Sequence, residues 1–310
     1  MTRKPLFHGP RRRGALLHLR TVRQLRAWPA PARGMLWMVG GGLCFSVLNT
    51  LARALSQQMD VYEAQFLRYL MGLLVMLPLV WRHGWQAYRP VNMVGQFWRG
   101  GVHTLGLVLW FTALPHIPLA DMTAIGFTGP IFIMLGAAWF LGEPMRGDRW
   151  IAALIGFAGV MVVVLPKMTG AGGWYNLVML ASSPVFAASF LITKALTRYE
   201  KPGVIVLWQA LTVTLLSLPM ALPHWQAPTA WQWLGFAVTG VLGTLGHYCL
   251  TRAFHSADIS ATQSLRFLDL VWASVLVWLV FGDVPSPSTW LGALVILLAT
   301  VWIARRESQR

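Results

Sequence analysis

Residues 113–144 read ALPHIPLADMTAIGFTGPIFIMLGAAWFLGEP, and residues 253–284, which lie 140 positions further on, read AFHSADISATQSLRFLDLVWASVLVWLVFGDV. The two stretches share a phenylalanine at the same offset, Phe127 and Phe267, and both end on a glycine followed by an acidic residue. The similarity continues on both sides at an offset of 140 or 141. The chain beyond residue 35 therefore consists of two copies of one unit.

The composition indicates an integral membrane protein. Of the 310 residues, 56% are hydrophobic and 11% are charged, whereas about 25% of the residues of a soluble domain are charged. A helix needs about 20 mainly apolar residues to cross a hydrocarbon core of about 30 Å. The chain contains ten such runs, which we place at 35–55, 61–81, 95–114, 119–142, 149–166, 174–196, 203–222, 230–252, 259–281 and 287–304.

The distribution of positive charge predicts the orientation and argues against a nucleic-acid partner despite the net charge of +15. Nine of the 25 Lys and Arg residues lie in residues 1–33, where no acidic residue occurs. Such a tail stays in the cytoplasm and can lie against anionic lipids, although it can also add little to function. Loops after even-numbered helices carry Arg82, Arg89, Arg99, Arg146, Arg149, Lys194, Arg198, Lys201 and Arg252. We therefore expect both termini in the cytoplasm.

The number of helices in each copy predicts how the copies are related. Five is an odd number, so the second copy enters the membrane from the opposite side. We expect a basic tail (1–34), a first repeat (35–166) and a second repeat (167–310) that ends in a short cytoplasmic segment. Inverted repeats are typical of secondary transporters, whose substrate sites lie near the midplane between the repeats. The chain contains no nucleotide-binding, zinc or catalytic-nucleophile motif, so we expect no cofactor, no metal and no catalytic residues.

The ten-helix duplicated plan, FLGEP at 140–144, FGDV at 281–284 and Arg68 in FLRYL resemble the EamA-type transporters of the drug/metabolite transporter superfamily. The resemblance covers residues 35–305. It implies a single-domain helical bundle in the bacterial inner membrane that carries small organic metabolites. The sequence of the first copy is most similar to that of family members associated with transport of S-adenosylmethionine, riboflavin or amino acids.

The two copies depart from the family pattern in different ways. Family members often carry an acidic residue followed by proline partway along helices 4 and 9. Here helix 4 has Gly129-Pro130, and helix 9 has Asp269-Leu270. Proline removes a backbone donor and clashes with the preceding turn, so we expect a kink in the first copy alone.

Charged residues deep in the membrane are the first candidates for function, because each is costly there. Arg266 and Asp269 are three residues apart in helix 9 and share a face with Gln263. One interpretation is a cavity lining that binds a charged or zwitterionic substrate, with Asp269 also able to exchange a proton. The alternative is an ion pair that only fixes helix packing. Arg68 aligns with Gln209, and we weigh substrate binding equally against a contact between helices.

Polar and aromatic residues predicted near the midplane complete the candidate substrate site. His247 and Tyr248 suit hydrogen bonding and stacking on a planar ligand, although a lone membrane histidine is more often a packing partner. The other candidates are His103, Asn49, Trp110, Phe127, Thr128, Ser183 and Phe186. Few polar groups among aromatic rings are the usual lining of a small-molecule site, but such rings are also ordinary core.

Two further acids lie near helix ends. We place Glu63 in the outer headgroup layer. Glu143 lies beside Arg146 and Arg149 and is expected to form loop ion pairs or a gate.

These observations predict a secondary transporter of a small organic metabolite that works by alternating access, as a monomer or homodimer, with proton coupling as a hypothesis. One alternative is an integral-membrane enzyme on lipid-linked substrates, which would need longer loops than the chain has. The other is a passive channel. The sequence leaves substrate and direction open.

Overall fold

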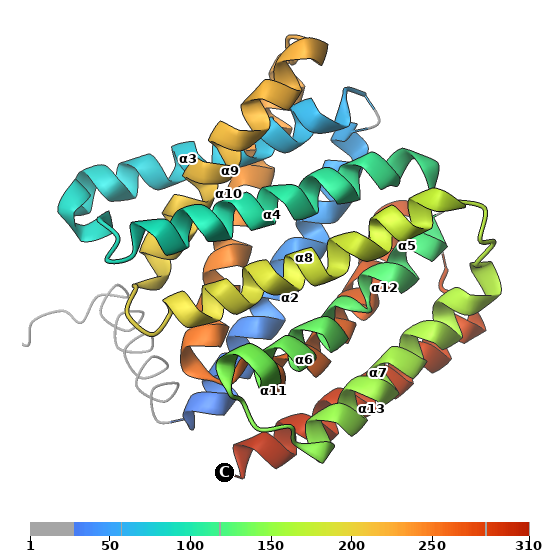
Figure 1. Cartoon of the computed structure of the whole chain (residues 1–310). Coiled ribbons are helices and arrows are strands. Elements are labelled where there is room, and N and C mark those ends of the chain that lie inside the picture. Colours follow the sequence, from blue (N-terminus) through green and yellow to red (C-terminus); the bar gives the residue numbers. More distant parts are fainter. Residues whose placement is uncertain (1–27, 57, 118, 283, 310) are drawn as a thin grey trace, which may run out of the picture.

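The computed structural model describes residues 28–56, 58–117, 119–282 and 284–309, which contain helices and no β-strand. All ten predicted spans are helical, and two of them are interrupted (Figure 1). The α-helices are α2 (Ala30–Ser56), α3 (Val61–His83), α4 (Met93–Ala113), α5 (Leu119–Gly126), α6 (Gly129–Leu141), α7 (Gly147–Val164), α8 (Trp174–Leu196), α9 (Pro202–Ala221), α10 (Ala230–Ser256), α11 (Ile259–Gln263), α12 (Leu268–Phe281) and α13 (Pro287–Ser308). Short 3-10 helices lie at Trp85–Tyr88, Leu114–His116, Leu165–Lys167, Leu222–His224 and Ser264–Phe267.

Length and apolar character identify the membrane spans. Within the described residues, eight segments are long and apolar enough to cross a membrane, with α5 and α6 together forming the span Asp121–Leu141. The two remaining segments are α4, which carries Arg99 and His103, and α11–α12, which is interrupted by a 3-10 turn. The prediction of an all-helical, ten-helix membrane protein is confirmed.

The glycine shared by the two repeats has a clear structural reason. Gly142 ends α6 with φ 68°, and Gly282 ends α12 with φ 74°. Both angles are in the left-handed region, which a side chain at Cβ disfavours and glycine adopts readily. The FLG and FG endings of the repeated stretch are therefore helix stop signals in both copies.

Both repeats contain a broken helix, so the expectation of a kink in the first copy alone is wrong. In the first repeat, α5 ends at Gly126 and α6 begins at Gly129, immediately before Pro130. In the second repeat a 3-10 turn over Ser264–Phe267 separates α11 from α12 without any proline. The carbonyl of Ile259 accepts hydrogen bonds from Thr262 Oγ1 (2.7 Å) and Gln263 Nε2 (2.9 Å). Such side-chain bonds compete with the helical backbone pattern.

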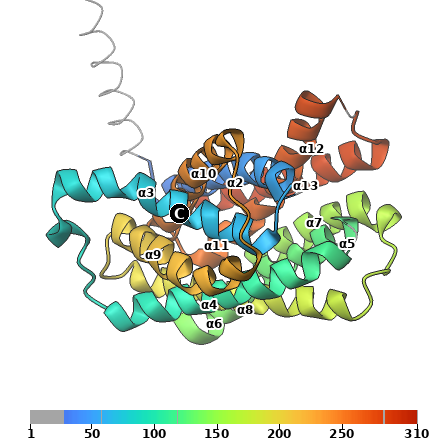
Figure 2. The ribbon, with the colours of Figure 1, turned by 90° about the horizontal axis from the view of Figure 1, so that it is seen from above.

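The helices of one repeat pack mainly against helices of the other. α2 contacts α10 and α12. Its counterpart in the second repeat, α8, contacts the counterparts of those two helices, α4 and α6. α3 packs on α9 and α10, just as α9 packs on α3 and α4. α7 and α13, the last helix of each repeat, lie side by side, as Figures 1 and 2 both show. This pattern is that of a pseudo-two-fold relation, and it places α2, α4, α8 and α10 around the centre of the bundle.

Candidate functional site

His247 on α10 lies at the centre of an aromatic cluster formed by helices of both repeats. Its ring is 5.0 Å from Phe45, 5.6 Å from His103 and 6.4 Å from Tyr69, measured between centroids. Both ring nitrogens of His247 are buried without a hydrogen-bond partner among the described residues. A buried polar group without a partner is costly, so this ring is a candidate to receive a bond from a ligand.

His103 on α4 is held in place from two sides. Its Nε2 lies 2.9 Å from the hydroxyl of Tyr69 on α3, and its Nδ1 lies 3.2 Å from Ser189 Oγ on α8. The ring of Phe186 packs edge-on against His103 at 5.3 Å. These contacts leave His103 without spare hydrogen-bonding capacity, and they join α3, α4 and α8 beside His247.

Arg99 is a buried member of this region, and its placement in a cytoplasmic loop is wrong. It is 1% exposed and lies inside α4, one helical turn before His103. Its guanidinium donates to Thr193 Oγ1, to the carbonyl of Ile205 (3.1 Å) and to Gln209 Oε1 (2.6 Å). All three acceptors are neutral. The position of Arg99 within the predicted span 95–114 was the signal that could have identified it.

Two further arginines reach the same region with free guanidinium groups. Arg68 lies over the ring of Tyr69, at 5.1 Å, and Arg266 lies over the ring of Phe190, at 5.2 Å. Neither has a hydrogen bond or an ion pair to another described residue, and both side chains are half-buried.

Arg266 lies among buried residues. Its chain neighbours Leu265 and Phe267 are 3% and 0% exposed. Phe190, whose ring it covers, is itself buried and contacts His103. The guanidinium therefore packs beside the aromatic cluster around His103 and His247.

Asp269 follows the break in the second repeat and does not form the expected ion pair with Arg266. Among the described residues no ion pair within 4.0 Å joins the two. Arg266 is turned onto Phe190, whereas the Asp269 carboxylate lies directly against Gly42 of α2, with Trp272 nearby. The packing-only ion pair is thereby contradicted, and the carboxylate is half-buried with no hydrogen-bond partner among the described residues.

The other predicted site residues divide into two groups. Trp110 and Phe186 pack with Tyr69 on the side of His103, and Tyr248 contacts Trp37 at 6.1 Å. The second group surrounds the two helix breaks, and its polar members bond to nearby backbone, although Gln263 Oε1 has no hydrogen-bond partner among the described residues. The group comprises Phe127, stacked on Phe267 at 5.8 Å, Thr128 and Ser183, which both donate to the carbonyl of Ile125, and the fully buried Gln263. Asn49 is exposed and lies apart from both groups.

A second polar cluster lies at the end of the molecule where α13 ends; we call it the terminal cluster. Arg149 binds Glu307 (2.9 Å), Asp258 (3.0 Å) and Ser260 (2.8 Å), and is 4% exposed. Lys194 donates to the carbonyls of Phe254 (2.7 Å) and Ala257 (2.6 Å) at the end of α10.

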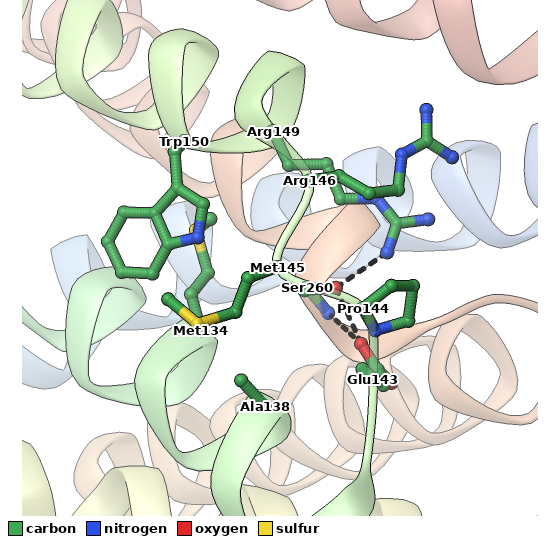
Figure 3. A pocket seen from close by; sticks show the side chains of 9 residues that line it. All are labelled: Met134, Ala138, Glu143, Pro144, Met145, Arg146, Arg149, Trp150 and Ser260. Carbon is green, nitrogen blue, oxygen red and sulfur yellow. Dashed lines mark hydrogen bonds between the residues drawn. The ribbon is translucent and has the colours of Figure 1, made fainter.

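Glu143 belongs to the terminal cluster but does not pair with the arginines beside it. It accepts hydrogen bonds from the backbone N–H groups of Ile259 (2.8 Å) and Ser260 (3.0 Å) and from Ser260 Oγ, and so caps α11 (Figure 3). Arg146 and Arg149 pair instead with acids further along the chain, both of them reaching Glu307. A carboxylate at a helix N-terminus binds orphan N–H groups, which explains the preference.

Glu63 and Asp121 hold loops near the other ends of the helices. Glu63 is 0% exposed and accepts a hydrogen bond from the N–H of Gln226 (3.0 Å), while its position in the outer headgroup layer stays a prediction. Asp121 is equally buried and binds the N–H groups of Thr169 (3.1 Å) and Gly170 (2.8 Å). Carboxylates therefore fasten backbone segments between the repeats at several points.

The comparisons with known proteins agree with this architecture. The EamA-like transporter family matches residues 32–165 and 173–305, and the chain belongs to this family. A riboflavin transporter of Rhizobium johnstonii is 35% identical over 89% of this chain and 92% of its own length. A riboflavin transporter of Vibrio cholerae is 31% identical over 90% and 95%.

More distant relatives share the fold and the class. An S-adenosylmethionine uptake transporter of Rickettsia felis is 26% identical, covering 89% of this chain and 94% of that one. A solved crystal structure with 19% identity superposes with a TM-score of 0.77 over 88% of this chain and 98% of that one, which shows the fold. The protein is therefore a multi-pass membrane transporter of small metabolites, a member of the drug/metabolite transporter superfamily.

The contact between Gly42 and Asp269 gives a first test of the interior site. A methyl group at Gly42 would collide with the Asp269 carboxylate, whereas nothing lies within 4 Å of the same position at Gly40 on the same helix. We expect Gly42→Ala to reduce the initial rate of transport at least tenfold while Gly40→Ala leaves it within twofold. Membrane abundance of both variants, measured on blots, should match the wild type. Equal transport by the two variants would show that the carboxylate position is unimportant.

Proposed function

We propose that this chain is a secondary transporter that carries riboflavin, or a metabolite with a similar flat ring, across the bacterial inner membrane. The observation that carries the proposal is the aromatic cluster between the repeats, where the rings of Phe186, Phe190 and His247 all contact that of His103 and the guanidinium of Arg266 covers Phe190. Stacking rings and a few hydrogen-bonding groups suit a planar heteroaromatic ligand. The names of the two relatives above 30% identity support the same substrate.

Alternating access is the mechanism that the symmetry supports. Equivalent helix pairs make equivalent contacts in the two repeats, so the two repeats can exchange conformations and expose the site to either side. The breaks between α5 and α6 and between α11 and α12 supply places where half-helices can move. Exposure at the end where α13 ends would require the terminal cluster to separate.

The proposal includes the orientation and the absence of catalysis. The positive-inside rule places both termini in the cytoplasm, and the terminal cluster then lies on the cytoplasmic side. The relatives named above are transporters, which supports a chain without catalytic activity.

Flavin transport is tested directly with the purified full-length chain in proteoliposomes. We expect saturable uptake of labelled riboflavin, recovered chemically unchanged, and accelerated uptake when unlabelled riboflavin is loaded inside. Such counterflow is the mark of a carrier and separates it from a channel. Protein-free vesicles are the control. Uptake no faster than in those vesicles, or a flavin recovered in altered form, would contradict the proposed function.

Proton coupling through Asp269 is a second, separable hypothesis. The carboxylate lies in the interior without a hydrogen-bond or ion-pair partner among the described residues, so it is free to gain and lose a proton during the cycle. We expect Asp269→Asn to abolish uptake driven by a pH gradient while substrate exchange continues. Asp60→Asn is the matched control, since Asp60 caps α3 and asparagine is an equally good cap. Gradient-driven uptake that survives Asp269→Asn would eliminate this residue as the coupling group.

A further inference from the structure

The interior of the protein carries more positive than negative charge. Arg68, Arg99 and Arg266 lie in the central region, and Asp269 is the acid nearest to Arg266. Each of the three arginines, together with His103, lies within electrostatic range of the His247 ring. The Asp269 carboxylate lies against Gly42 of α2.

None of these arginines is neutralised by a carboxylate in direct contact. Arg99 binds three neutral acceptors, on Thr193, Ile205 and Gln209. Arg68 and Arg266 contact aromatic ring faces, which attract cations but carry no net charge. The ion pairs among the described residues lie instead in the terminal cluster, at Arg146 and Arg149.

An unpaired guanidinium far from bulk water is retained at a cost, which an anion in the site would offset. Arg99 already donates from all three of its nitrogens to protein acceptors, whereas the Arg68 and Arg266 guanidiniums, at half-buried positions, have no hydrogen-bond partner among the described residues. Guanidinium groups bind phosphate and carboxylate oxygens in a forked, two-bond geometry. His247, with both ring nitrogens unpartnered and buried, lies within electrostatic range of both arginines as a further hydrogen-bonding group.

We propose that Arg68 and Arg266 form an anion-binding site, so that the site prefers planar aromatic metabolites carrying a phosphate or carboxylate group over their neutral counterparts. The ring stacks among His103, Phe186 and Phe190, and the anionic group lies between the two arginines. This inference rests on the proposed function and specifies the substrate class of the same site. For a flavin ligand it predicts that the 5′-phosphate of riboflavin binds more tightly than riboflavin, and that cations are rejected.

The test compares two ligands that share one ring and differ in charge. Binding of riboflavin and of riboflavin 5′-phosphate to the purified full-length chain is measured by quenching of flavin fluorescence. We expect the phosphate to bind at least tenfold more tightly, which corresponds to about 1.4 kcal/mol. Arg68→Gln combined with Arg266→Gln should abolish the difference. The control combines Arg82→Gln with Arg305→Gln, which removes the same charge from exposed positions and should keep it.

Lysine at both positions keeps the positive charge but not the forked, two-bond geometry of the guanidinium. Arg68→Lys with Arg266→Lys should therefore retain part of the preference for riboflavin 5′-phosphate over riboflavin. This variant also keeps the test valid if the glutamine variant elutes as aggregate. Equal affinity of the wild type for the two flavins would overturn the anion site. A tenfold preference that persists in the glutamine variant would overturn it as well.

Failure of the flavin proposal is recognised separately. If neither flavin binds, thermal stability of the purified chain is measured with phenyl phosphate, benzyl alcohol and benzylamine, which differ mainly in charge. The anion site predicts stabilisation by phenyl phosphate above that by the alcohol, and none by the amine. Two results would refute the anion site. One is stabilisation by benzylamine equal to that by phenyl phosphate. The other is stabilisation by phenyl phosphate that persists when both arginines are replaced.

Discussion

A break in a helix inside a membrane leaves backbone N–H and C=O groups that lipid cannot bind, and each must find a partner within the protein. At the first break the carbonyl of Ile125 accepts hydrogen bonds from the hydroxyl groups of Thr128 and Ser183. At the second break the carbonyl of Ile259 accepts hydrogen bonds from Thr262 and Gln263. Ser183 comes from α8 of the other repeat, so the first break is satisfied in part by the packing of the two repeats.

The same constraint explains why charge gathers inside. Once irregular backbone and polar side chains occupy the centre, residues such as Arg99 can donate there to Thr193, to Gln209 and to the carbonyl of Ile205. Arg68 and Arg266 have no such partners among the described residues and are half-buried. The division between saturated and unsaturated polar groups separates residues that hold helices together from residues that are free to bind substrate.

Much of the fold could be predicted from the sequence, because apolar run length and the internal repeat are strong local signals. All ten helices and the glycine stops at Gly142 and Gly282 follow from them. The second helix break escaped prediction because it depends on side-chain bonds to Ile259 rather than on proline. Arg99 was misplaced for a related reason: positive charge near a helix end indicates a loop unless the tertiary partners are known.

The candidate site was predicted in outline, and its details required contacts between distant helices. His103, Phe186, His247 and Arg266 lie together, whereas Thr128, Ser183 and Gln263 serve the backbone at the breaks. The spacing along one helix also suggested an ion pair between Arg266 and Asp269. The two residues do not form it, because a 3-10 turn separates α11 from α12 there.

The central claim is that the aromatic cluster around His103 and His247 is the substrate site and that it opens to each side of the membrane in turn. Its most direct test is a single cysteine at Phe186, in a chain where Cys44 and Cys249 are replaced, labelled with a membrane-impermeant thiol reagent in right-side-out and inside-out vesicles. The account predicts labelling from both sides, slowed by bound substrate. Labelling from neither side, or labelling that saturating substrate leaves unchanged, would contradict it.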